Sequence, residues 1–253
     1  MTQVVSLRKN TTDHQQLKLK RWAMTAEEEM TDRIVDLKGV SRVIPALDLT
    51  KPERYWALMR ELRGLVKIVK VSWVTLLTIG PEGLRKLILD NSDVYFLMDA
   101  KLADVNFING LIAGRLREIG IRGVIMHGFV GSVNVPRVED LDLILLASMT
   151  SGGELYDANF DYVIKIVKDV NAAGVVIGGN KPNLIARARA ILGSGYVILS
   201  PGIGAQGVKP GCAIAHGADF EIVGRAIYES SNPREAFIRI EDEARRADIN
   251  RCK

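Results

Sequence analysis

The sequence has few cysteines and no long apolar run, and each of these features excludes a class of protein. None of its 253 residues belongs to an apolar stretch of the roughly 18 residues that span a bilayer. The first residues lack the apolar segment of a secretory signal. The two cysteines, Cys212 and Cys252, are too few and too poorly placed to predict a disulfide framework. We therefore expect a protein of the reducing cytoplasm, with no membrane partner.

An excess of one charge is also missing from most of the chain. The formal net charge is +4, and residues 1–24 account for all of it, because five of the 34 basic residues lie there against Asp13 alone. Such a tail can contact nucleic acid. This one has no aromatic residue beyond Trp22 and no nucleic-acid motif, so we expect a solvated tail and keep nucleic-acid contact as the alternative. The spacing of Thr25 and Glu28 then predicts a short leading helix.

From about residue 25 the chain alternates between apolar runs of strand length and amphipathic segments of helix length. The runs consist largely of valine, isoleucine and leucine, as expected of parallel strands that are buried on both faces. Eight such runs occupy residues 42–49, 66–73, 94–102, 123–129, 143–149, 174–180, 196–203 and 220–225.

The segments between the runs predict helices. Pro81, Pro182 and the pair Asn232-Pro233 are typical of helix starts. The segment before Ile119 has an apolar stripe that predicts Ile108 in the core. Two segments, 130–142 and 210–216, are short for helices. Eight strand–helix units predict a single-domain (β/α)8 TIM barrel over residues 25–253, with residues 1–24 as an extension. A doubly wound open sheet is the alternative, but it rarely has eight parallel strands in so short a chain.

Charged residues gather where the predicted strands end, which is where such barrels carry their function. Asp48 ends the first run, Lys70 lies in the second, and Asp99, Lys101 and Asp104 end the third. Period-two alternation places Asp99 and Lys101 on one face of their strand, within reach of Lys70. Charges are costly to bury unless paired. A structural ion-pair network is the alternative, but the clustering at several strand ends favours a catalytic site.

A second group of residues is typical of a phosphate site. Residues 200–207 form a glycine-rich turn that includes Pro201 and Gln206, and Gly224 and Arg225 follow the eighth run. The loops after strands seven and eight are the usual phosphate grip of this fold. Backbone N–H groups, the Gln206 amide and the Arg225 guanidinium would bind the anion. His127 fits a packed structural role better than an acid–base role.

Together these residues resemble the orotidine 5′-monophosphate decarboxylase family, in particular its archaeal and bacterial short forms. The resemblance covers most of residues 40–245. Asp-Ala-Lys-Leu-Ala-Asp at 99–104 matches the D-x-K-x-x-D signature of the suprafamily. The family's other motifs follow in order: Ala-Leu-Asp-Leu at 46–49, Val-Lys-Val at 69–71, His-Gly-Phe at 127–129, the turn at 200–207, and Ile-Val-Gly-Arg-Ala-Ile-Tyr at 222–228.

The resemblance implies a homodimeric lyase that converts orotidine 5′-monophosphate (OMP) to UMP and CO2, the last step of de novo pyrimidine nucleotide synthesis, without metal or cofactor. Lys70, Asp99, Lys101 and Asp104 correspond to the family's charged tetrad. Lys101 would donate a proton to C6, and Asp99 would lie against the departing carboxylate. Asp104 would enter the partner subunit's site.

The same resemblance implies the binding residues. Asp48 would bind ribose, Thr150 the uracil, and Gln206 and Arg225 the 5′-phosphate, with Pro201 and Gly224 beside them. The chain departs from the family at Thr150, where a serine is usual. It also has Val-Asn-Phe at 105–107 instead of Ile-Pro-x, and Ile108 instead of a ribose-binding threonine.

Two other functions remain open at this point. Metal-dependent sugar-phosphate decarboxylases or aldolases share the signature, but they carry an acidic Mg²⁺ ligand on the second strand where this chain has Lys70. A cation there repels a metal. A catalytically degenerate barrel that only binds a nucleotide is the second alternative. Ile108 favours it mildly, and the intact tetrad argues against it.

Overall fold

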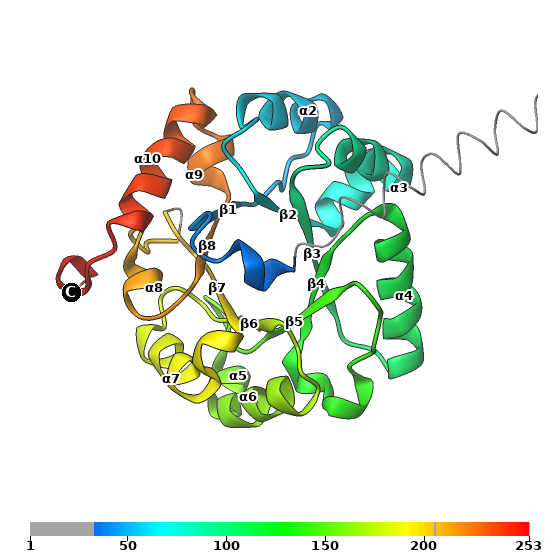
Figure 1. The fold of residues 1–253 in the computed structure, drawn as a ribbon, viewed down its shortest axis with the longest axis vertical. Coiled ribbons are helices and arrows are strands. Elements are labelled where there is room, and N and C mark those ends of the chain that lie inside the picture. Colours follow the sequence, from blue (N-terminus) through cyan, green and yellow to red (C-terminus); the bar gives the residue numbers. More distant parts are fainter. Residues whose placement is uncertain (1–32, 205, 253) are drawn as a thin grey trace, which may run out of the picture. The chain divides into compact units, whose positions relative to one another are not determined.

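The computed structural model describes residues 33–204 and 206–252, in which eight parallel strands form one sheet in the order β1-β8-β7-β6-β5-β4-β3-β2. A bridge between Ala46 and Lys70 joins β1 to β2, so the sheet nearly closes into a barrel (Figure 1). The predicted TIM barrel is confirmed. The strands are β1 (Val43–Pro45), β2 (Ile68–Ser72), β3 (Tyr95–Leu102), β4 (Gly123–His127), β5 (Asp142–Leu146), β6 (Gly174–Val176), β7 (Val197–Pro201) and β8 (Phe220–Val223).

Helices surround this ring of strands (Figure 1). Their apolar faces pack on strands whose residues are almost all buried, from Val43 in β1 to Val223 in β8. The α-helices are α2 (Pro52–Glu61), α3 (Trp73–Leu89), α4 (Asn106–Ile119), α5 (Glu154–Ala158), α6 (Phe160–Asp169), α7 (Pro182–Leu192), α8 (Cys212–Ala215), α9 (Arg225–Tyr228) and α10 (Pro233–Arg245).

Proline and capping signals locate four of the nine α-helix starts in the described residues, those of α2, α3, α7 and α10. Asn232 accepts a hydrogen bond from the Glu235 backbone, and Pro233 opens α10, as predicted. The start of α3 differs from the prediction. Ser72 caps a helix that begins at Trp73, directly after β2, and the Gly80-Pro81 pair only breaks it. Gly80 has a φ of 69°, which a residue with a side chain would rarely adopt.

The two segments predicted to be short lack full helices. Between β4 and β5 the chain forms only two 3-10 turns, η2 (Gly128–Val130) and η3 (Ser132–Asn134). Between β7 and β8 it forms only the single turn α8. The fourth strand–helix unit is thus reduced to a loop, which lies beside the start of α4.

The buried face of α4 is not the predicted one. Ile108 is only half-buried and Leu111 is 53% exposed, whereas Asn109 is fully buried together with Ala113 and Leu116. The helix is rotated so that an asparagine faces inward. The prediction of Ile108 as a core residue is therefore wrong, because apolar spacing could not register the hydrogen bonds that Asn109 makes.

A short turn covers the end of the barrel where the strands begin. In η1 (Ile34–Leu37), Ile34 is fully buried and its backbone N–H donates to Asp142 at 2.7 Å. Asp142, the first residue of β5, also accepts from Tyr95 Oη at 2.9 Å and pairs with Arg33. Burial beside this carboxylate raises the pKa of Tyr95. One buried carboxylate thus ties η1 to β3 and β5.

The cysteines are closer together than the sequence suggested. Cys212 and Cys252 form a disulfide, with their Cα atoms 5.4 Å apart. The two residues are 40 positions apart in sequence, but α10 and the following turn η5 (Ile249–Cys252) bring the chain back to α8. The two cysteines, judged too poorly placed to predict a disulfide framework, are therefore close enough to pair.

Some predictions concern residues that the structure does not describe. The basic tail (1–24) and the leading helix from Thr25 both lie outside the described residues. Among the helices that are described, none combines the length and the apolar character that crossing a bilayer requires.

Candidate active site

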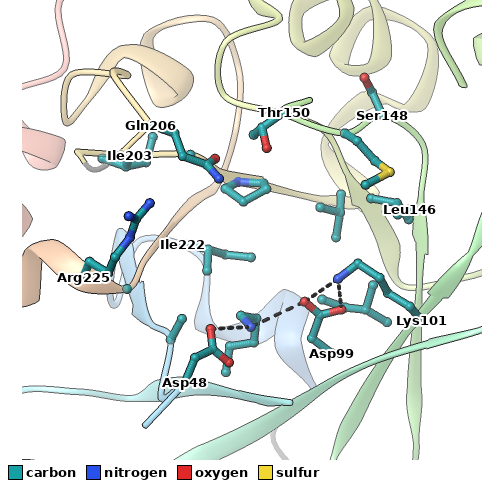
Figure 2. Close-up of a pocket in the computed structure, with 18 of the residues that line it drawn as sticks. Asp48, Asp99, Lys101, Leu146, Ser148, Thr150, Ile203, Gln206, Ile222 and Arg225 are labelled. Atoms are coloured by element: carbon teal, nitrogen blue, oxygen red, sulfur yellow. Dashed lines mark hydrogen bonds and ion pairs between the residues drawn. The ribbon is translucent and has the colours of Figure 1, made fainter. Parts of the chain in front are cut away.

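A cavity of about 280 Å³ opens where the strands end. Figure 2 shows Asp48, Asp99 and Lys101 along one side of it, with Thr150 and Gln206 opposite. Nine of the ten residues predicted for the site line this cavity, and Asp104 is the exception. The nine are Asp48, Lys70, Asp99, Lys101, Thr150, Pro201, Gln206, Gly224 and Arg225.

Charges of alternating sign form a row across the barrel. Lys70 Nζ lies 3.5 Å from Asp48 Oδ2 and 3.4 Å from Asp99 Oδ2. Lys101 Nζ lies 2.7 Å from Asp99 Oδ1 and 2.8 Å from Oδ2. At the Asp48 end of the row, the Ser72 hydroxyl donates a hydrogen bond to Asp48 Oδ1 at 2.6 Å. Each buried charge thus has an opposite neighbour, as low-dielectric surroundings require.

An irregularity in β3 sets the direction of Lys101. The pairing of β3 with β4 shifts between Asp99 and Leu102, and Lys101 has a φ of 45°. Such a left-handed backbone is uncommon for lysine and stores strain of about 1–3 kcal/mol. Asp99 and Lys101 do reach the same cavity, but a bulge brings them there, not the regular alternation that the sequence suggested.

Asp99 is held in its ionised form. Burial opposes the charge, but Lys70 and Lys101 together outweigh it and hold the pKa of Asp99 below its ordinary value. The side chain of Asp99 is 14% exposed, whereas that of Lys101 is 42% exposed. A fixed anion therefore lies beside a cation that a ligand in the cavity can contact.

The turn after β7 forms the opposite wall. Gly202, Gly204 and Gly207 all have positive φ, so glycine is needed for this path. The turn carries Gln206, and α9 begins nearby with Arg225, which forms no ion pair with any carboxylate of the described residues. The Arg225 guanidinium and the Gln206 amide in the cavity lining could both donate hydrogen bonds to an anionic group.

Two residues of the loop after β6, Asn180 and Lys181, make contacts just outside the cavity. Asn180 Nδ2 donates to the Thr150 carbonyl at 2.9 Å, while Lys181 pairs with Asp157. Asp157 also accepts from Ser148 at 2.7 Å, and Figure 2 shows the Ser148 hydroxyl turned away from the cavity. Asn180 and Lys181 thus both contact other parts of the chain beside the cavity.

The apolar wall of the cavity was not predicted from the sequence. These side chains belong to the barrel strands and the turn after β7, where nothing distinguishes them from the rest of the core. They line the same space as Asp99 and Lys101, and a desolvated wall strengthens nearby electrostatic interactions. The residues are Ala46, Ile125, Leu146, Val176, Ile203 and Ile222.

His127 takes no part in the cavity lining. Its ring stacks on Phe129, with centroids 4.8 Å apart, and its Nδ1 contacts the Tyr156 hydroxyl. Burial lowers the pKa of His127. These contacts agree with a packed structural role. Within the described residues, no three His, Cys, Asp or Glu side chains form a set that could hold a metal ion.

One protein family matches most of this chain, and relatives that carry its name are similar to the chain in sequence. The model of the "Orotidine 5'-phosphate decarboxylase / HUMPS family" matches residues 41–240. The orotidine 5′-phosphate decarboxylase of Pyrococcus abyssi is 39% identical over 206 residues, which are 80% of this chain and 99% of that protein. The enzyme of the same name from Pyrococcus horikoshii is 37% identical over 80% of this chain and 99% of its own length.

Solved structures show the same likeness. The crystal structure of the Pyrococcus horikoshii enzyme has a TM-score of 0.73 and 35% identity, and the match covers 80% of this chain and 99% of that one. The Metallosphaera sedula enzyme has a TM-score of 0.70 and 34% identity, over 82% of this chain and all of that one.

Proposed function

The chain belongs to the orotidine 5′-phosphate decarboxylase / HUMPS family, and from this premise we propose that it decarboxylates OMP to UMP and CO2. The observation that carries the proposal is the row of Asp48, Lys70, Asp99 and Lys101 along one wall of the cavity. As a step of pyrimidine nucleotide synthesis, the reaction belongs to the cytoplasm.

The reaction breaks the bond between C6 and the carboxylate and leaves the electron pair on C6. Such a carbanion needs stabilisation that exists only in the transition state. Lys101 supplies a cation beside C6 and then the proton that C6 takes up. Asp99, held ionised by its two lysines, repels the substrate carboxylate, which leaves as neutral CO2. The apolar wall accommodates that neutral product.

The remaining contacts bind the parts of OMP that do not react. Arg225 and Gln206 hold the 5′-phosphate, with Pro201 and Gly224 beside them, and Asp48 holds the ribose. Thr150 contacts the uracil and keeps the hydroxyl of the family's serine. Binding energy from these remote groups positions C6 against Lys101.

A homodimer completes the site in this proposal. Asp104 is exposed and does not line the cavity of its own chain, so it is available to a second copy. The neighbouring Val105, the first half of α4 and the loop after β4 expose large apolar side chains: Val105, Phe107, Leu111 and Val133 are 53–78% exposed. Apolar patches of this kind are typical of protein interfaces. We infer that Asp104 enters the partner's site as this surface is buried.

Lys70 supports metal-free chemistry over that of the metal-dependent relatives. Its ammonium lies between Asp48 and Asp99, at the point where a divalent cation would need acidic ligands. Together with Lys101, this ammonium balances the charge of the two carboxylates within the chain itself. The curated relatives described above carry the decarboxylase name, which points the same way.

A direct assay tests the proposal. Purified protein mixed with OMP is expected to remove the ultraviolet absorbance of the substrate at the same rate with and without EDTA. Lys101→Ala is expected to abolish turnover while UMP still binds, because the phosphate and base contacts remain. Isothermal titration with UMP measures that binding.

Other outcomes would reject the proposal in different ways. No turnover at micromolar enzyme would leave only a nucleotide-binding barrel. Turnover lost in EDTA would indicate the metal-dependent chemistry. Turnover retained by Lys101→Ala would remove Lys101 as the proton donor. Lys67→Ala, which removes a surface lysine paired with Asp93, is the matched control and should behave as wild type.

A further inference from the structure

Asn109 is a fully buried polar side chain that the mechanism above does not use. Its Oδ1 accepts from the Asp104 backbone N–H at 3.1 Å, and its Nδ2 donates to the Asp104 carbonyl at 2.6 Å. The second Nδ2 hydrogen goes to the Asn134 carbonyl at 2.9 Å. Both donors and the acceptor of the amide are thus engaged. Two of its three hydrogen bonds hold the backbone of a single residue, Asp104.

Two further asparagines extend this arrangement to the loop after β4. The Asn106 N–H donates to Asn134 Oδ1 at 3.2 Å. Asn106 Nδ2 donates to the carbonyls of Val133 and Val135 at 3.1 and 3.2 Å. A proline, common at position 106 in the family, has neither an N–H nor a side-chain donor to make these bonds. We call Asn106, Asn109 and Asn134 the asparagine clamp.

The clamp joins two loops at the rim of the barrel. One carries Asp104 and the exposed Val105 and Phe107, and the other carries Val133, which is 78% exposed. The charged side chain of Asp104 itself makes no ion pair with any described residue, and it accepts a hydrogen bond from the adjacent Val105 N–H at 2.7 Å. The backbone of Asp104 is therefore fixed, while its carboxylate is presented outward.

We propose that Asn109, supported by Asn106 and Asn134, is a positioning residue that fixes Asp104 for the active site of the partner subunit. This inference rests on the proposed function and on the donation of Asp104 across the dimer. A catalytic carboxylate that crosses an interface must be held from its own subunit, because a misplacement of about 1 Å can cost a hundredfold in rate. The clamp acts in one subunit and its effect appears in the other.

Hybrid dimers separate this role from a general structural one. A donor chain carries Lys101→Ala and keeps Asp104, and an acceptor chain carries Asp104→Asn and keeps Lys101. Only one site of the hybrid then has both groups. Asn109→Ala is added either to the donor or to the acceptor chain. Both hybrids are purified through two different tags, and their turnover of saturating OMP is compared.

We expect Asn109→Ala to lower kcat at least tenfold in the donor chain and less than twofold in the acceptor chain. The matched control is Asn91→Ala. Asn91 is also buried, but its Nδ2 donates to the Leu87 carbonyl at the end of α3, so the two hybrids should be equal. An equal loss for both Asn109 hybrids, or no loss in either, would overturn the inference.

Failures at other levels are distinguishable. Absence of OMP turnover in the wild type would refute the proposed function. Inactivity of a hybrid without the Asn109 change would refute donation of Asp104, and the inference with it. If Asn109→Ala does not fold, Asn106→Ala removes an exposed side chain instead. It should give the same asymmetry, at least threefold, and symmetry there would overturn the proposal.

Discussion

At the scale of single residues, Lys70 is the charged group of the cavity that is most removed from water. Its side chain is 8% exposed and lies between Asp48 and Asp99. An isolated ammonium would be costly in such surroundings, and the two carboxylates offset that cost. The dependence is mutual, because Lys70 is also one of the two cations that keep Asp99 ionised.

Replacing Lys70 should therefore change the pH dependence of turnover. In the wild type the pKa of Asp99 lies below its ordinary value, so protonation of Asp99 should not limit kcat/KM above pH of about 4. In Lys70→Gln, burial is opposed by Lys101 alone, and the pKa of Asp99 rises. The acid limb should then move to higher pH, in addition to any loss of rate.

Profiles of kcat/KM between pH 4 and 8 check this expectation, because this range begins near the ordinary pKa of a carboxyl group and extends above it. Lys67→Gln, three residues earlier and paired with Asp93 at the surface, should keep the wild-type profile. An acid limb at the same pH in Lys70→Gln and wild type would show that Lys70 does not control Asp99.

Residue types predicted many of the residues that line the site, but not the residues and backbone geometry that position them. A charge after a buried strand is visible in sequence, and so were Asp48, Asp99 and Arg225. Asn109 was not, because an asparagine at a helical position looks the same whether it faces solvent or clamps a backbone. The left-handed backbone of Lys101 was equally hidden, since it depends on the pairing of β3 with β4.

At the scale of elements, η1 is held by a single buried carboxylate. Asp142→Ala would leave the Ile34 N–H and the Tyr95 hydroxyl without an acceptor. Buried unpaired groups of this kind cost roughly 3 kcal/mol or more in total. We expect thermal unfolding to shift down by roughly 5–10 °C. Turnover at 25 °C should be unchanged, because these strand starts lie at the barrel end opposite the cavity.

Differential scanning calorimetry and the OMP assay measure the two quantities. Asp140→Ala is the matched control, because Asp140 is exposed and makes a surface ion pair with Arg117. Its Tm should change by about 1 °C or less. A fall in turnover with unchanged Tm in Asp142→Ala would contradict the assignment.

Glu221 links β8 to α8 and the turn before it. It is fully buried and accepts from the backbone N–H groups of Gly211 and Ala213 at 2.8 and 3.0 Å. Burial raises its pKa from 4.5 to about 7, against these hydrogen bonds. Between those two pH values, Glu221 is therefore protonated in the folded protein and ionised in the unfolded chain.

The stability that Glu221 contributes should accordingly fall as pH rises from 4.5 to about 7, and then stay level. Glu221→Gln cannot titrate. The Tm of Glu221→Gln relative to wild type should therefore be higher at pH 8 than at pH 5, by several degrees. A constant difference between the two proteins at both pH values would show that Glu221 does not take up this proton.

At the scale of the whole molecule, the disulfide closes a covalent loop near the end of the described chain. Cys212 and Cys252 are 40 residues apart, and the entropy of closing such a loop corresponds to about 4 kcal/mol. Both half-cystines lie outside the lining of the candidate site. The bridge is thus placed to stabilise the fold without contact with the chemistry.

The double variant Cys212→Ser/Cys252→Ser should have a Tm lower by several degrees and an unchanged kcat at 25 °C. Wild type treated with a dithiol reductant should show the same shift, and reductant should not affect the variant. An unchanged Tm in both comparisons would mean that the bridge contributes nothing to stability.

The overall architecture was predictable because eight apolar runs with helical segments between them have few other arrangements. Contacts between residues far apart in the sequence were not. The pairing of Cys212 with Cys252 depends on where α10 ends, and the turn at Ile34 is anchored to Asp142 about a hundred positions later. Local sequence patterns do not register such distant partners.

The alternating row also affects how a substrate approaches the cavity. Asp48, Lys70, Asp99 and Lys101 sum to zero, so Arg225 supplies the entire formal charge of the cavity lining. At a distance the row is only a weak multipole, whereas the guanidinium is a monopole that attracts anions. A nucleotide with its charge concentrated at the phosphate would thus be turned phosphate-first during diffusion, before any short-range contact forms. Orientation on encounter and catalysis after it would then depend on different groups, and only the first would weaken strongly as salt rises.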